Sequence, residues 1–290
     1  MQDINVLSLY AVMSTEEFRE IKEQFVYHKE MLHSLGSIRY CKAELFKDCI
    51  LGTIRIPQKN EQKKAQLSFG FYLTGRKVLL IEDEGKLNAW IEKQTEMFKE
   101  VDTPKQLLLR IMERMIEEDT LYFSHMESEL DKLEEEISGG AGRNNNFFTS
   151  LTKHRQKLSE FNIYYEQLIN IAELFSTCDF YQSEQDTQGW DRFMHRMERL
   201  QNHVHLLREN VLQIRELYQS MQDARQNKIM VVITIVTTIF MPLTLITGWY
   251  GMNFVYMPEL QWRYGYIAVI IISLFIVIAE IVYFKKKKFF

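Results

Sequence analysis

The sequence predicts an α/β cytoplasmic domain with a small mixed sheet, then a helical hairpin, then a very long helix that continues into the first of two membrane spans. Three observations predict this fold class. Strand-like and helix-like segments alternate over the first hundred residues, residues 103–228 are almost wholly helical in pattern, and two long apolar runs follow.

The composition excludes several classes of protein. The net charge of −4 argues against a chain whose whole surface binds nucleic acid. The three cysteines are widely spaced and form no CxxC pair, so neither a disulfide framework nor a cysteine zinc site is indicated. Because the sequence has no glycine-rich phosphate loop and no HExxH motif, we expect neither an enzyme nor an organic cofactor.

Residues 1–102 are interpreted as the α/β domain. Five short segments are rich in β-branched and aromatic residues, which is typical of strands: INVLSLY (4–10), SIRYCKAELFKD (37–48), CILGTIRI (49–56), AQLSFGFYLTG (65–75) and KVLLIED (77–83). Between the first two, Ser14 and Glu17 form a capping box for a helix whose apolar positions keep helical spacing to Phe25. A further helix is expected from Leu87 to Glu100.

Residues 103–186 are predicted to form the helical hairpin. Thr103 and Pro104 are a typical N-cap and first-turn pair. The expected boundaries are 103–138 for the first helix, 138–146 (SGGAGRNNN) for the breaker and 147–178 for the second helix. Ten acidic residues lie between Glu113 and Glu136; a solvated helix face explains them, and attraction of cations is the alternative.

The segment DTQGW (186–190) is expected to be the next break. Residues 187–228 then form a stalk helix without proline or further glycine that enters the first apolar run without interruption. One helix from Trp190 to Thr247 would be roughly 87 Å long at 1.5 Å per residue. A helix of this length is stable when it packs along its length, which predicts a bundle of identical copies.

Two apolar runs predict membrane spans at 229–248 and 264–284. The first contains 19 consecutive uncharged residues, which at 1.5 Å each cover roughly 28 Å, about one bilayer core. The second contains one charge, Glu280, which we expect to extend toward the lysines that follow it. The alternative, two buried helices of a large soluble core, is unusual for runs this apolar on every side.

Charges on either side of the spans predict the topology. Arg225 and Lys228 precede the first span, and the basic tail 285–290 follows the second. The connecting loop, 249–263, holds only Glu259 and Arg263 as charged residues. The positive-inside rule therefore places both termini in the cytoplasm and the loop outside the cell membrane.

A polar seam runs along the first span. Residues spaced alternately by three and four positions are polar, flexible or small: Asn227, Met230, Thr234, Thr237, Met241, Thr244 and Gly248. The other faces carry residues that suit lipid, so the seam is interpreted as the lining of a water-filled pore. The alternative is that the threonines bond to their own backbone and hold helices together.

The loop carries the most specific motif. It reads WYGMNFVYMPELQWRYG, with Gly-Met-Asn directly after a span and MPEL further on. This string resembles the CorA family of divalent-cation channels, whose mark is Gly-Met-Asn between two C-terminal spans. The resemblance extends through NKIM, TIFMPLT, YGMNF and MPEL to the lysine tail, residues 227–290.

The resemblance implies a funnel-shaped homopentamer in which the long helix lines the pore and the second span lies outside it. It implies an external selectivity filter of Gly251, Met252 and Asn253. It implies that the pore is lined by Asn227, Met230, Ile233, Met241, Thr244 and Gly248. Met230 and Ile233 would lie in the hydrophobic gate, and leucine is common in the family at the latter position.

The function implied is influx of Mg²⁺, with Co²⁺ and Ni²⁺ as further substrates, down the electrochemical gradient. Mg²⁺ releases its water reluctantly, so a neutral ring of Asn253 amides suits a filter for the hydrated ion. Glu259 at the outer mouth would attract cations, or would form a loop salt bridge with Arg263.

Cytoplasmic Mg²⁺ closes channels of this family by binding acids between subunits. Candidates here are Glu82, Asp83, Glu84 and Asp191, for which ordinary surface acids are an equal alternative. Two other functions stay open: a Zn²⁺ transporter of the same family, and a membrane-anchored oligomeric scaffold that transports nothing. The partners expected are copies of the chain itself, the lipid bilayer and divalent cations, with no nucleic acid.

Overall fold

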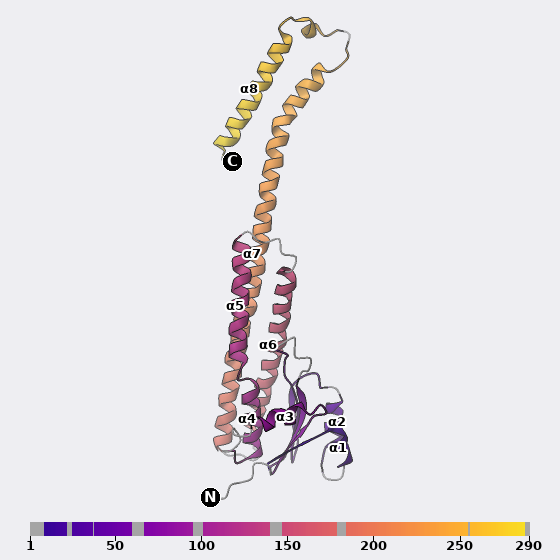
Figure 1. Cartoon of the computed structure of the whole chain (residues 1–290), viewed down its shortest axis with the longest axis vertical. Helices are drawn as coiled ribbons and strands as arrows, with labels where there is room; N and C mark the ends of the chain where they lie inside the picture. The colour runs from indigo at the N-terminus through magenta and orange to yellow at the C-terminus, as the bar shows by residue number, and fades with distance from the viewer. Residues whose placement is uncertain are drawn as a thin grey trace. The chain divides into compact units, whose positions relative to one another are not determined.

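The computed structural model divides the chain into two compact units, 1–215 and 216–290 (Figure 1). The structure describes residues 9–21, 25–36, 38–59, 67–94, 101–139, 147–178, 184–254 and 256–287, apart from the side chains at 184, 185, 259 and 260. One long helix, α7 (Glu184–Tyr250), contributes residues to both units.

The first unit contains a five-stranded sheet of order β1-β5-β4-β3-β2. The strands are β1 (Tyr10–Met13), β2 (Lys42–Leu45), β3 (Ile50–Arg55), β4 (Ser68–Leu73) and β5 (Val78–Ile81). β1 pairs with β5 in parallel and the other neighbours are antiparallel, which confirms the mixed sheet. A strand was predicted at 4–10, and residues 4–8 of it lie outside the described part. Within that part, β1 begins at Tyr10, opposite Val78, and extends three residues beyond the predicted end.

Two short helices cover one face of the sheet. α1 (Thr15–Glu20) begins at the predicted capping box, with the Ser14 side chain accepting from the Glu17 backbone N–H and the Glu17 side chain accepting from Ser14. The predicted continuation to Phe25 is wrong, because α1 ends at Glu20 and a second helix, α2 (His28–Leu35), follows.

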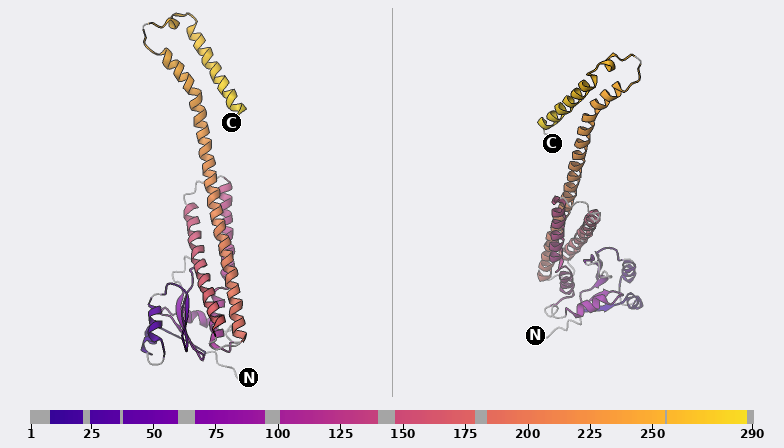
Figure 2. Two further views of the ribbon diagram at one scale, coloured as in Figure 1. Left: turned by 180° about the vertical axis from the view of Figure 1, so that it is seen from behind. Right: turned by 45° about the horizontal axis from the view of Figure 1, so that its top comes forward.

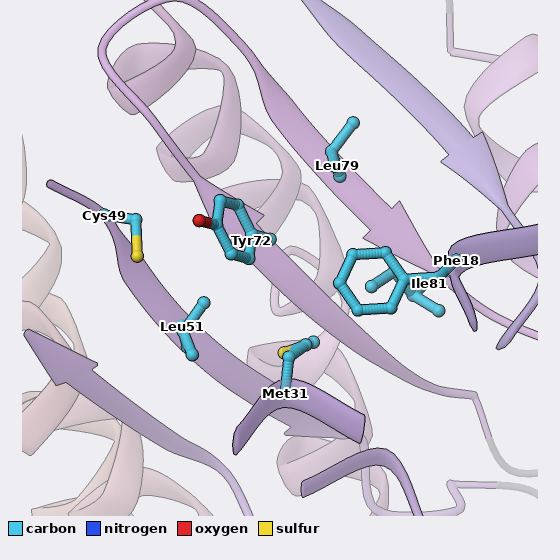
Figure 3. Close-up of a cluster of buried hydrophobic side chains, with 7 residues drawn as sticks. All are labelled: Phe18, Met31, Cys49, Leu51, Tyr72, Leu79 and Ile81. Atoms are coloured by element: carbon cyan, nitrogen blue, oxygen red, sulfur yellow. The ribbon is translucent and has the colours of Figure 1, made fainter. Parts of the chain in front are cut away.

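These two helices and the sheet share one core (Figure 3). Neighbouring strands present side chains to the same face, since Leu51 pairs opposite Tyr72 and Tyr72 opposite Leu79. Phe18 of α1 and Met31 of α2 pack on this face, and both are fully buried. The remaining members are Cys49 and Ile81. The core therefore joins α1 and α2 to β3, β4 and β5, and Ala11 and Met13 of β1 pack against it.

The other face of the sheet meets the helical part of the unit. α3 (Lys86–Glu92) follows β5, and α4 (Pro104–Met115) begins with the predicted Thr103 cap and Pro104. The prediction of one helix over 103–138 is wrong: the chain turns at 116–118, and α5 (Asp119–Ser138) begins afresh.

Tertiary contacts explain that turn. Asp119 is 1% exposed, and its Oδ2 accepts a hydrogen bond of 2.6 Å from the Tyr165 hydroxyl. Lys59 forms an ion pair with the same carboxylate. Burial raises the pKa of Asp119, and the charge of Lys59 and the hydrogen bonds from Lys59 and Tyr165 act against that rise. These contacts, with complete burial of Ile116, outweigh the helix propensity of the two glutamates between them.

The hairpin of α5 and α6 (Phe147–Thr177) confirms the predicted pair of helices. Phe123 packs edge-to-face against Phe161 and Tyr165, with ring centroids 5.1 and 6.1 Å apart. The first part of α7 lies beside both helices (Figure 2), and Trp190 stacks on Phe175 at 4.2 Å.

The break predicted at 186–190 is wrong, because α7 already begins at Glu184 and runs through it. Gly189 does not interrupt the helix but lies against α4. A Cβ added at Gly189 would be 2.8 Å from Leu109 Cδ2. Glycine here permits a close approach of two helices, which is a role that the sequence alone does not distinguish from a break.

The second unit consists of the rest of α7, a loop and α8 (Gly265–Lys286). The loop contains one 3₁₀ turn, η4 (Pro258–Gln261). α7 and α8 each contain an apolar stretch that is long enough to cross a membrane, and 6% of each stretch is buried within the chain. The two spans were predicted in these helices.

Candidate ion pathway

The predicted pore-lining residues of α7, which are the seven seam residues and Ile233, are all exposed. Met230, Ile233 and Met241 are 65, 59 and 72% exposed. The polar and small members are also exposed: Asn227, Thr234, Thr237, Thr244 and Gly248. We call these eight residues the α7 seam.

The least exposed residues of the same stretch lie on the other side of the helix. Ile235 is buried, and Val231, Ile239, Pro242 and Ile246 are half-buried. At 100° per residue, this group points away from the α7 seam. The single chain therefore leaves the polar side of α7 uncovered.

The threonine hydroxyls of the α7 seam bond to their own helix. Those of Thr234, Thr237 and Thr244 donate to the carbonyls four residues earlier, at 2.7 to 2.8 Å. This is the alternative interpretation of the threonines, and it holds within one chain. A hydroxyl has one hydrogen and two lone pairs, so the same bonds leave acceptor oxygens along the seam.

The Gly-Met-Asn motif forms the turn that ends α7. The Gly251 N–H donates to the Thr247 carbonyl at 2.9 Å, and the Met252 N–H donates to the Trp249 carbonyl at 3.3 Å. A Cβ on Gly251 would lie 2.9 Å from the Thr247 carbonyl oxygen, so a side chain there would displace the turn.

Asn253 follows this turn and is exposed, and its side-chain amide has no hydrogen bond within the described part of the chain. The Met252 side chain is 42% exposed. The motif thus presents an amide and a thioether to the surroundings of the chain. Glu259 lies in η4, and its side chain is outside the described part.

The predicted regulatory acids do not come together in one chain. Glu82 is 9% exposed and accepts backbone hydrogen bonds at the start of α3, including one of 3.0 Å from Glu84. Asp83 accepts two hydrogen bonds from Thr15, at 2.6 and 2.9 Å. Glu84 pairs with Lys86, and Asp191 lies in the second turn of α7.

Across the described ranges, no three His, Cys, Asp or Glu residues are grouped to hold a metal ion. A regulatory site built from these acids needs ligands from a second copy, and that part of the prediction stays a prediction.

Glu280 lies where the sequence did not lead us to expect it. It lines an open groove along α7 whose walls are mainly apolar and which also includes Thr237 and Thr244. The described residues give it no ion pair with the lysines that follow, toward which it was predicted to extend. A single charge in an apolar run is a visible signal of a functional position, but the direction of its side chain is not visible in sequence.

Two long apolar helices joined by a short loop, with a polar seam on one helix, define a membrane protein. The model of the CorA-like Mg²⁺ transporter protein family matches residues 5–286, which is nearly the whole chain. The chain belongs to this family.

Similar proteins are named as metal-ion transporters. The chain is 48% identical over 85 residues to the cobalt/magnesium transport protein CorA of Thermotoga maritima, which covers 29% of this chain and 24% of that protein. It is 46% identical over 83 residues to the putative metal ion transporter YfjQ of Bacillus subtilis, 29% of this chain and 26% of that protein. These alignments span about a quarter of each relative.

The fold also has a solved counterpart. The complete structure of the CorA magnesium transporter from Methanocaldococcus jannaschii superimposes with a TM-score of 0.79, over 96% of this chain and 90% of that one. The identity is 20%, so this likeness concerns the fold. The predicted fold class is confirmed over both units.

Proposed function

We propose that several copies of this chain form a channel that carries hydrated Mg²⁺ across the cell membrane. The observation that carries the proposal is the α7 seam, a polar and exposed face of a membrane-spanning helix that leads to the exposed Asn253. The family model over residues 5–286 supports the same function, as does the name of the T. maritima relative.

The assembly is inferred from the face of α7 that a single chain leaves exposed. A single α7 cannot enclose a pathway, and its polar face is unfavourable in lipid. Several copies with their seams turned inward would bury that face around water. We propose a homopentamer with both termini in the cytoplasm, since basic residues flank the cytoplasmic ends of both spans.

Selection would take place at the external turn formed by Gly251, Met252 and Asn253. Mg²⁺ keeps its water shell tightly, so a ring of amide oxygens can accept hydrogen bonds from the ion's waters without removing them. Because the ring is neutral, the ion also leaves readily. Met230 and Ile233, both apolar and exposed, would close the inner pathway by excluding water.

The gradient supplies the energy. A doubly charged ion gains about 4.6 kcal/mol for each 100 mV of inside-negative potential. Influx therefore needs no ATP. Co²⁺ and Ni²⁺ would pass as well, because a filter that contacts water rather than the metal discriminates weakly among hydrated ions. Cytoplasmic Mg²⁺ would act as a regulatory ligand that stabilises the closed state through acids such as Asp83 and Asp191.

A flux experiment separates this function from the two alternatives. The purified chain is placed in liposomes with an internal Mg²⁺ dye and a set membrane potential, and Zn²⁺ is tried in place of Mg²⁺. We expect Mg²⁺ entry that rises as the interior becomes more negative. Zn²⁺ entry that needs a proton gradient, without Mg²⁺ entry, would instead indicate a zinc transporter. If assembled oligomers carried neither ion, the result would support the alternative of a membrane-anchored scaffold that transports nothing.

A further inference from the structure

A concave pocket of about 590 Å³ lies between α4 and the first turns of α7, within the first unit. Four arginines line this pocket: Arg110 of α4, and Arg192, Arg196 and Arg199 of α7. Leu109 and Phe193 line it as well, and both are buried and apolar. A concave site of this size, with apolar walls and a few charged groups, is typical of small-molecule binding.

The three arginines of α7 share one face of the helix. Arg196 follows Arg192 by four positions and precedes Arg199 by three, and side chains at these spacings are neighbours on a helix. Like charges at these spacings destabilise the helix. Across the described ranges, none of the three forms an ion pair or a hydrogen bond. The fold therefore holds three positive charges together at a cost in stability.

Two of the three acidic residues that line the pocket are engaged by other groups. Glu113 pairs with Arg110, with 3.1 Å between Oε2 and Nη1. The buried Asp186 accepts a hydrogen bond of 3.3 Å from the Thr103 hydroxyl. Asp102 is exposed. The arginines of α7 thus outnumber the carboxylate that is left to face them.

Two further acids near the α7 arginines have partners of their own. Glu198 contacts the His195 ring at 2.9 Å. Asp119 pairs with Lys59; burial raises the pKa of Asp119, and the charge of Arg196 is one of the contributions that oppose this rise. Acids of the same chain therefore compensate the three arginines only in part.

An occupant that matches these walls carries several negative charges. A guanidinium group is always protonated, and its planar fork binds a phosphate group through two parallel hydrogen bonds. Arg192 and Arg199 are seven residues apart, which is about 10 Å along the helix axis. Positive charges spread over that length favour a chain of two or three phosphates over a single one. The apolar side chains of the pocket suit the uncharged part of such a molecule.

We propose that the pocket between α4 and α7 binds the di- or triphosphate group of a free nucleotide. Arg192, Arg196 and Arg199 hold the phosphate oxygens, and the bound anion removes the repulsion among the three arginines. The site does not depend on the proposed transport. Because α7 continues into the second unit, a bound nucleotide contacts the same helix that carries the α7 seam.

Calorimetric titration of the full chain in detergent with ATP, pyrophosphate and inorganic phosphate tests the site. The variant is Arg192→Gln with Arg199→Gln, and the matched control is Arg208→Gln with Arg215→Gln, which removes two charges of α7 outside the pocket. We expect the pocket variant to lose at least tenfold in affinity for ATP and pyrophosphate, and the control to lose less than threefold. Inorganic phosphate should bind at least tenfold more weakly than pyrophosphate. Equal losses in both variants, or no binding to the native chain, would overturn the proposal.

The variants without ligand separate this site from a contact between copies of the chain. If the arginines form a ligand site, removing two like charges should keep the oligomer content and keep or raise the midpoint of thermal unfolding. If they instead bound an acidic face of a second copy, the pocket variant would lower the oligomer content. That result would overturn the proposal.

A further measurement needs no variant and covers the case in which the pocket variant does not fold. Phenylglyoxal modifies accessible arginines, and mass spectrometry of the α7 peptides reports the modified fraction of each. We expect ATP to reduce the modified fraction of Arg192 and Arg199 severalfold and to leave Arg215 unchanged. Equal modification with and without ATP would contradict the site. Since these tests measure nucleotide binding, their failure would leave the proposed ion transport untouched.

Discussion

The two units of this chain differ in how far their apolar side chains are buried within the chain. In residues 9–215, the core residues of the sheet and hairpin, such as Phe18, Phe123 and Trp190, are fully buried. In residues 216–287, Ile235 and Phe284 are the buried ones within the described part, and most of α7 and α8 is exposed. The first unit completes its own core. The second presents apolar and polar faces that the single chain leaves exposed.

Separating the units is the strongest way to test that comparison. A chain ended after Arg215 keeps every strand, the hairpin and the buried part of α7. We expect it to be soluble and folded without detergent, whereas the full chain requires detergent or lipid. Circular dichroism with a cooperative thermal transition would check this. A shortened chain that aggregates or melts without cooperativity would show that the first unit depends on the second.

Substitutions at two glycines of the second unit test whether the turn after α7 supports the proposed filter. A Cβ at Gly251 would lie 2.9 Å from the Thr247 carbonyl oxygen, while one at Gly248 meets nothing within 4 Å. Gly251→Ala should therefore displace the turn and lower Mg²⁺ flux by roughly tenfold, about 1.4 kcal/mol of barrier. Gly248→Ala should preserve the turn and cost less, and the two are compared by liposome flux at matched oligomer content. Equal losses of Mg²⁺ flux in the two variants would mean that the geometry of the turn at Gly251 does not determine the flux.

Two threonines of α7 test the seam itself. Both Thr244 and Thr247 donate to a carbonyl of their own helix, but Thr244 lies on the α7 seam and Thr247 does not. Thr244→Val removes an acceptor from the pathway and should lower flux by about threefold, ~0.6 kcal/mol of barrier. Thr247→Val removes a similar internal hydrogen bond and should change flux little. The reverse order would place the pathway on another face.

The smallest expected effect on flux comes from a change in the first unit. Tyr165 is fully buried, and its hydroxyl donates to the buried Asp119. Tyr165→Phe leaves that carboxylate with one donor fewer and should destabilise the unit by about 1–3 kcal/mol. Chemical denaturation measures this loss, and flux in liposomes serves as the control, since the pathway is not altered. A stable variant with lost flux would reveal a coupling between the units that we do not expect.

Local signals in the sequence were sufficient for the helix starts. The capping box of Ser14 and Glu17 and the pair Thr103 and Pro104 act within one turn of chain, and the structure has both. The turn at 116–118 was not predicted, and the break predicted at 186–190 is wrong, because both places depend on distant residues. At the turn before Asp119, that residue contacts Lys59 and Tyr165. In the helix that continues through 186–190, Gly189 lies close to Leu109.

The candidate site divides in the same way. The spacing of the α7 seam and the Gly-Met-Asn motif are periodic or contiguous, so sequence alone identified them. The direction of Glu280 and the hydrogen bonds of Asp83 involve residues far apart in the chain, which no local pattern encodes. Contacts between the α7 seams of several copies lie outside a single chain, and the flux experiments test them.

Mg²⁺ flux through Asn253→Ala, compared with Gln261→Ala, tests the central claim most directly. Both residues are exposed amides of the same loop, but only Asn253 follows the turn at the end of α7. At equal oligomer content and potential, we predict near-complete loss of Mg²⁺ entry in Asn253→Ala and near-native entry in Gln261→Ala. Native flux in Asn253→Ala would contradict a filter at the Gly-Met-Asn turn.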